Sequence, residues 1–96
     1  MDADNGESRH ALIESGQMTA GDLRIGAGNF LFDEPPEGPR ISAGLWLYVR
    51  DREDLDRHVR VHEGEQIEIA GYTISVDSIL KENNKRGLIY FSVQAP

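Results

Sequence analysis

The sequence predicts a small, mainly β domain, built as a sandwich or a partly open barrel of about six or seven short strands. Apolar residues alternate with polar residues at period two in several segments, and Gly, Asn and Pro separate these segments at short intervals. The length of 96 residues is enough for a single core. We therefore expect one β domain over residues 9–96, preceded by a disordered acidic tail over residues 1–8.

The first half of the chain predicts two extended regions. Residues 10–15 favour a short strand over a capped helical turn, because a glycine follows them. Residues 22–25 alternate as a half-buried strand does, and residues 26–29 are typical of a turn or a β-bulge. Residues 30–32 then resume an extended apolar segment. Residues 33–39 contain three prolines and therefore predict an exposed loop.

The second half predicts a central strand, a hairpin and a final strand. Residues 41–49 are the most apolar segment and favour the centre of a sheet, and the charged residues 51–56 allow one helical turn. Residues 58–62 alternate, with their two valines directed inward. Residues 66–78 predict a hairpin. The final strand, residues 87–93, is expected at a sheet edge, where a partner can add a strand.

Composition excludes several classes of function. The chain has no cysteine, so it forms no disulfide, no thiolate metal site and no cysteine nucleophile. A formal charge of -7 repels nucleic acid and anionic membrane at long range, and is compatible with a basic protein partner. Residues 1–7 do not resemble a secretory signal, and the longest apolar run, residues 45–49, is far too short to span a bilayer. We expect a soluble cytoplasmic protein that binds neither nucleic acid nor membrane.

Two histidines and an arginine mark one candidate site. His58 and His62 are four residues apart, which on a strand separates them by about 13 Å, too far for one zinc ion to bind both. Arg60 lies between them on the same predicted face and makes a cation site still less favourable. The pattern therefore predicts a solvent-facing ridge of His58, Arg60 and His62 and no metal or cofactor. Such a ridge can contact an acidic or phosphorylated ligand.

Two aromatic residues mark a second candidate site. Trp46 and Tyr48 share one face of the predicted central strand, while Leu45, Leu47 and Val49 share the other. Trp46 and Tyr48 are either part of the core or an exposed patch of the kind that anchors protein interfaces. Acidic residues follow further along the chain and are candidates for electrostatic contact with a partner: Glu63, Glu65 and Glu68.

These observations support three hypotheses about function. The first is a non-catalytic protein-binding module, such as an acidic inhibitor, an immunity or anti-defence protein, or an accessory subunit, because the chain is small and acidic and contains no catalytic motif. The second is a ligand-binding or enzymatic barrel that uses the histidine ridge. The third is a structural subunit of a larger assembly, which includes a homo-oligomer.

Overall fold

The computed structural model describes residues 6–33, 40–82 and 84–96, and it confirms the predicted class. Two antiparallel four-stranded sheets pack face to face, and they do not close into a barrel. The strands in the described residues are β1 (Glu7–Ile13), β2 (Gln17–Ala20), β3 (Leu23–Asp33), β4 (Arg40–Val49), β5 (Arg57–Val61), β6 (Gln66–Ile69), β7 (Tyr72–Leu80) and β8 (Leu88–Gln94). A 3-10 turn, η1 (Glu53–Leu55), precedes β5.

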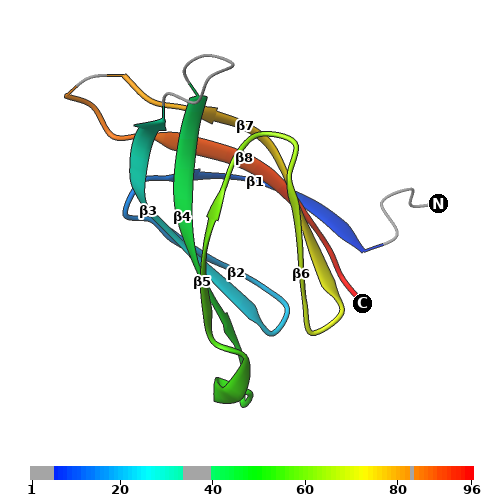
Figure 1. Ribbon diagram of the computed structural model, residues 1–96. Coiled ribbons are helices and arrows are strands. Elements are labelled where there is room, and N and C mark those ends of the chain that lie inside the picture. The colour runs from blue at the N-terminus through cyan, green and yellow to red at the C-terminus, as the bar shows by residue number, and fades with distance from the viewer. Residues whose placement is uncertain (1–5, 34–39, 83) are drawn as a thin grey trace.

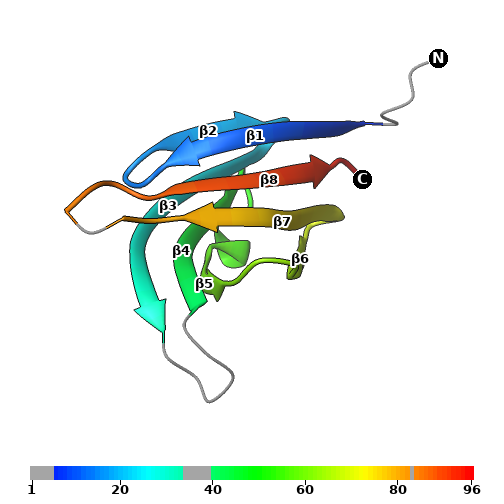
Figure 2. The same ribbon diagram turned by 90° about the horizontal axis from the view of Figure 1, so that it is seen from above.

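The order of strands is β1-β8-β7-β6 in one sheet and β2-β3-β4-β5 in the other. Figure 1 shows β1, β8 and β7 of the first sheet running across β3 and β4 of the second, and Figure 2 shows β1, β8 and β7 lying side by side. Hairpins join β2 to β3, β3 to β4, β6 to β7 and β7 to β8. The chain crosses between the sheets after β1 and again after β5.

The core lies between the two sheets and follows from the alternation in the sequence. Outside the bulges, each strand directs every second side chain inward, and most of the inward residues are aliphatic or aromatic. Leu23, Ile25, Leu45 and Leu47 are fully buried from one sheet. Ile74, Ile89, Phe91 and Val93 meet them from the other sheet. Burying these side chains is the main stabilising contribution to the fold.

Two β-bulges interrupt the ladders, and a glutamate binds a backbone N–H beside each of them. The register shifts between Gly28 and Leu31 in β3, and between Val76 and Ser78 in β7. At the first bulge the N–H of Phe30 donates to Glu14 Oε2 at 3.2 Å. At the second, the N–H of Ile79 donates to Glu63 Oε2 at 3.1 Å, so both carboxylates satisfy donors beside irregular pairing.

Glu14 also connects three separate parts of the chain. Its Oε1 accepts the N–H of Gly87 at 2.8 Å and the Nζ of Lys81 at 3.0 Å. The Glu14 and Lys81 side chains are each 18% exposed, so this pair is shielded from solvent. The carboxylate therefore holds the turn after β1, the bulge of β3 and the segment before β8 together.

Several sequence predictions need correction in detail. The predicted edge position of the last strand is wrong, because β8 lies between β1 and β7 and both of its edges are paired. β1 begins at Glu7 and pairs with β8 along its length, so the strand starts inside the segment predicted as a tail. The described residues form eight strands, because residues 17–20 add a short strand that alternation did not reveal. Most of the predicted proline loop, residues 34–39, lies outside the described residues.

The segments that the sequence left open also take definite forms. The region 26–29 is a bulge within the single strand β3 and does not end it. The charged connection 51–56 contains η1. No helix within the described ranges is long and apolar enough to cross a membrane.

Candidate functional site

The two candidate sites predicted from the sequence meet on one surface. Trp46 and Tyr48 point outward from β4, on the side of the sheet away from the core. In the ladder between β4 and β5, Trp46 is paired with His58 and Gly44 with Arg60. The aromatic residues and most of the predicted ridge are therefore direct neighbours across two strands.

Outward-facing residues of all four strands form this surface, which we call the aromatic–basic face. Their positions follow from the pairing of β2 with β3, β3 with β4 and β4 with β5. They are Gln17, Thr19, Arg24, Gly26, Gly28, Leu31, Trp46, Tyr48, His58 and Arg60, and these side chains cover Ser42 and Gly44 on the same side of β4.

Trp46 and His58 stack on each other at the centre of this face. Their ring centres are 4.1 Å apart and their planes differ by 14°. Glycines make room for the stack. A Cβ at Gly28 would lie 3.1 Å from the indole, and a Cβ at Gly44 would lie 3.1 Å from His58 Nε2 and 3.4 Å from the indole. The rings therefore occupy space that any larger residue at these two positions would fill.

Arg24 and Tyr48 form a second cross-strand pair. The two residues are opposite each other in the ladder, and the Cζ atom of Arg24 lies 5.1 Å from the centre of the Tyr48 ring. This is a cation–π contact at a solvent-facing site. Among the described residues Arg24 has no carboxylate partner, so its charge is available on the surface.

Arg60 crosses the sheet from β5 toward β3. Its Nη1 donates to the Oγ of Ser42 at 2.8 Å and to the carbonyl oxygen of Asn29 at 3.0 Å. Asn29 has a φ of 52°, which belongs to the bulge of β3, and Ser42 is fully buried. The two contacts hold the guanidinium at the bulge end of the face and leave its other N–H groups available.

A hollow of about 270 Å³ lies beside Trp46, on the side away from His58. Its floor includes Gly26, and its walls are Trp46 and Tyr48 on one side and Ser15 and Gln17 on the other. A Cβ at Gly26 would have no neighbour closer than 3.8 Å, so the strand is open to close approach at this point. The hollow offers a ring surface, polar side chains and bare backbone together.

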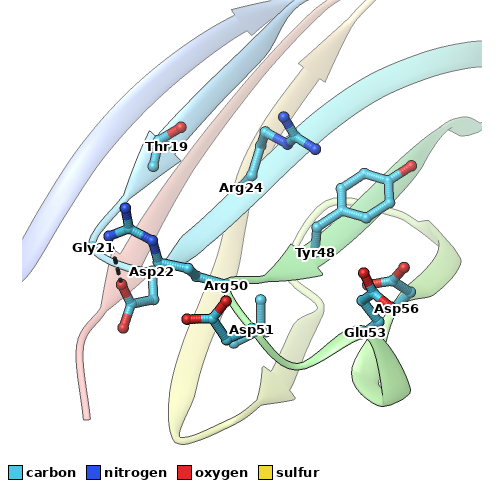
Figure 3. Close-up of a pocket in the computed structure, with 10 residues that line it drawn as sticks. Thr19, Gly21, Asp22, Arg24, Tyr48, Arg50, Asp51, Glu53 and Asp56 are labelled. Carbon is cyan, nitrogen blue, oxygen red and sulfur yellow. Dashed lines mark ion pairs between the residues drawn. The ribbon is translucent and has the colours of Figure 1, made fainter.

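A larger hollow of about 630 Å³ begins on the other side of Tyr48. Figure 3 shows Arg24 between Thr19 and Tyr48, and Glu53 and Asp56 at the η1 end. Arg50 lies 3.8 Å from Asp22 in an exposed ion pair, which contributes little to stability. Acidic side chains therefore line this hollow at both of its ends, with Asp22 beside Gly21 and with Glu53 and Asp56 at η1.

Charge is unevenly distributed in this protein. The aromatic–basic face contains two arginines and one histidine, and none of the side chains that the structure describes on it is acidic. The chain as a whole has 17 Asp and Glu against 10 Lys and Arg. The local charge of the face is thus opposite to the net charge of the protein.

The remaining predicted residues lie elsewhere. Glu63 binds the backbone of Ile79, and Glu65 accepts the N–H of His62 at 2.9 Å and lies 3.6 Å from its ring. Glu68 points outward from β6, in the opposite sheet. The structure therefore does not bring these acids together with Trp46, and it engages His62 with Glu65 in the turn after β5.

Sequence reasoning missed Arg24 as a site residue, and it interpreted Gly26 and Gly28 only as part of a turn or bulge, not as part of a binding surface. The alternation of Gly26 and Gly28 in an extended segment was the available signal, because glycine inside a strand marks a bulge or a close approach of another group. We find no group of three or more His, Asp or Glu residues placed to hold a metal ion in the described part of the chain. Comparisons with protein-family models, curated proteins and solved structures give no match to this chain.

Proposed function

We propose that this protein is a non-catalytic binding module whose ligand docks on the aromatic–basic face. The observation that carries the proposal is the Trp46–His58 stack, which holds a large ring in a fixed position beside an open hollow. A fixed aromatic side chain loses little conformational entropy on binding, and tryptophan is enriched among residues that dominate binding energy.

The shape of the site supports binding over catalysis. The charged side chains that line the larger hollow are exposed to water: Asp22, Arg24, Arg50, Asp51, Glu53 and Asp56. Catalytic acids and bases usually act in partly enclosed sites that exclude water and shift their pKa. A shallow, polar surface with fixed rings is more typical of recognition. A ligand-binding or enzymatic role for the histidine ridge remains the alternative, and a thermal-shift screen tests it.

The charge of the face changes the expected partner. The sequence suggested a basic protein surface that contacts Glu63, Glu65 and Glu68, with Trp46 and Tyr48 as anchors. The anchors instead lie with Arg24 and Arg60, so the face is complementary to an anionic ligand. A basic partner for the separate glutamates stays a prediction, and so do an inhibitor or immunity role and a cytoplasmic location.

Affinity capture from the native lysate with matched baits tests the proposal. The baits are the wild type, Trp46→Ala, and Tyr90→Ala as the control on the outer face of the opposite sheet. The proposal expects a species, protein or nucleic acid, that the wild type and Tyr90→Ala retain and Trp46→Ala loses. If a folded Trp46→Ala retains the same species, the aromatic–basic face is not the binding surface.

The opposite sheet supports the structural-subunit hypothesis as a second candidate. Ile13, Leu88 and Leu80 form a row across β1, β8 and β7, and Ile13 and Leu80 are 46% and 53% exposed. The neighbouring outward residues Ser78 and Tyr90 carry no formal charge at neutral pH, so two copies can meet here in spite of their net charge. The hypothesis is that this apolar row packs against the same row of a second copy of the chain. Light scattering tests it: the wild type is dimeric and Leu80→Ser is monomeric if the hypothesis holds, and a monomeric wild type rejects it.

A further inference from the structure

We propose that the aromatic–basic face binds a short segment of single-stranded nucleic acid, with one base stacked on Trp46 and phosphates at Arg24 and Arg60. This inference rests on the proposed binding function and names its ligand. It differs from the expectation drawn from net charge, because that expectation treated the charge as uniform over the surface.

One side of the Trp46 indole is not covered by His58 and is open to a ligand. His58 comes from β5 and covers the side of Trp46 that faces β5, while β3 and β2 lie on the other side. There the hollow of about 270 Å³ separates Trp46 from Gln17 and Ser15. A planar base can stack on the indole and meet the Gln17 amide and the Ser15 hydroxyl with its polar edge.

Two glycines of β3, Gly26 and Gly28, form what we call the glycine floor of the site. Gly26 and Gly28 alternate along β3 on this face, so no side chain stands between Trp46 and the residues of β2. The nearest heavy atoms to a Cβ at Gly26 are 3.8 Å away, on Gln17 and Trp46. A flat ligand can therefore lie against the backbone of β3, and a single added methyl group would obstruct it.

The two arginines of the face, Arg24 and Arg60, are placed to contact the phosphates of the strand. Arg24 lies at one end of the glycine floor, and the guanidinium of Arg60 lies at the other end, against Asn29. Along the strand this separation is about 15 Å, which suits a stretch of about two or three unstacked nucleotides. Among the described residues neither arginine has a carboxylate partner, and guanidinium groups pair readily with phosphate.

The acidic remainder of the protein limits the affinity but does not cancel the site. Electrostatic repulsion between exposed charges is largely screened beyond about 10 Å at 0.1 M salt. Four acidic residues line the second hollow, at the Tyr48 end of the face, and the proposed strand runs from Tyr48 toward Arg60, away from this hollow: Asp22, Asp51, Glu53 and Asp56. Near the Arg60 end, the carboxylate of Glu14 is already engaged by the N–H groups of Phe30 and Gly87 and by the ammonium of Lys81. Bases inside a duplex cannot reach Trp46, and the proposal is therefore restricted to single strands.

The test uses oligothymidylate of about twelve nucleotides, titrated into the wild type at about 50 mM salt. Trp46 is the only tryptophan, so its fluorescence reports on the site directly. We expect quenching on binding and a marked loss of affinity as salt rises. The same oligonucleotide as a duplex, thymidine monophosphate and inorganic polyphosphate distinguish a single strand from the base or the charge alone.

Four variants assign the contacts. Gly26→Ala adds one methyl group in ordinary van der Waals contact with Gln17 and Trp46, at 3.8 Å, so we expect an unchanged melting temperature and an affinity about tenfold lower. Arg24→Gln and Arg60→Gln should each lower the affinity. Each should also reduce by about one the slope of the logarithm of the affinity against the logarithm of the salt concentration. Arg9→Gln, on the outer face of the opposite sheet, is the matched control and should leave the affinity and its salt dependence unchanged.

Each outcome has a definite meaning. Absence of quenching, equal binding to duplex or polyphosphate, or an unchanged affinity in Gly26→Ala overturns the nucleic-acid proposal. If lysate capture still depends on Trp46 in that case, the binding function stands and the ligand is an acidic protein segment. If capture does not depend on Trp46 either, both proposals fail.

Discussion

The carboxylate of Glu14 is predicted to be the polar group on which the stability of this fold depends most. Its two oxygens accept the N–H groups of Phe30 and Gly87 and contact the ammonium of Lys81. Phe30 and Gly87 are both buried, so water cannot easily replace the carboxylate as an acceptor. Replacing Glu14 by alanine leaves two buried donors and one shielded charge without their partner.

The magnitude follows from the number of bonds lost. A hydrogen bond to a charged group contributes about 1.5–3 kcal/mol, and partial relaxation recovers some of the loss of two such bonds. We expect Glu14→Ala to lower the free energy of unfolding by about 2–4 kcal/mol. In a domain of this size, this corresponds to a fall in melting temperature of about 10–25 °C. Lys81→Met should cost less, because it leaves both N–H contacts of Glu14 in place.

Low pH should remove the contribution that the Glu14 carboxylate makes to the free energy of unfolding. Burial raises the pKa of Glu14, but the N–H of Gly87, the ammonium of Lys81 and the N–H of Phe30 outweigh it, so the pKa lies below its usual value of 4.5. The folded protein therefore keeps the carboxylate ionised at a pH where the unfolded chain takes up a proton. The stabilisation is complete above pH 4.5 and is lost as the pH falls through the lower pKa of the folded state.

Urea unfolding at neutral pH and at several lower pH values measures both effects. Glu68→Ala is the control, because Glu68 is exposed on β6, and it should change the free energy of unfolding by less than about 0.5 kcal/mol. A loss of less than about 0.5 kcal/mol in Glu14→Ala would refute the assignment of the carboxylate to the two N–H groups.

Three further predictions concern the packing and the titration of other residues. Gly44→Ala should crowd the carbonyl oxygen of Gly28 at 3.0 Å and the His58 ring at 3.1 Å, shift the stack of His58 on Trp46 and lower stability by about 1–3 kcal/mol, seen as a shifted tryptophan emission maximum and an earlier urea midpoint. Gly87→Ala should cost more than Gly44→Ala in the same urea assay, because its Cβ would overlap the ring of Phe30; equal stability to wild type would show that this ring can move aside. Burial lowers the pKa of His10, so the unfolded chain protonates first as the pH falls below 6.5 and the native state loses stability. His10→Gln should flatten this dependence of the unfolding free energy on pH, and an equally steep curve would contradict the prediction.

Local alternation was sufficient to predict the fold class, because inward and outward residues differ in kind along each strand. Residues 58–61, for example, alternate between exposed and buried side chains as predicted. The place of a strand within its sheet could not be predicted in this way. β8 was expected at an edge, yet nothing in its own residues reports that β1 pairs with it, since that pairing joins opposite ends of the chain.

The sequence identified the residues of the candidate site as two separate groups, without predicting that they meet. Trp46 and Tyr48 were singled out by strand periodicity, and His58 and Arg60 by the alternation of the next strand. Their meeting depends on the register between β4 and β5, which no local pattern encodes. Arg24 was missed for the same reason, because it becomes notable only through the tyrosine opposite it.

The interior position of β8 also sets the order in which the protein can be completed. Within the part of the chain that the structure describes, β1 has no hydrogen-bonded neighbour in its sheet other than β8, and β8 is the last of these eight strands to be synthesised. A nascent chain can form the β2-β3-β4-β5 sheet early, but β1 has to wait until residues 88–94 are synthesised. A chain interrupted before β8 would leave β1 without its partner and one edge of β7 unpaired, and both are templates for aggregation. Synthesis of β8 is thus the step that converts an aggregation-prone intermediate into a domain in which β1 and β7 are both paired.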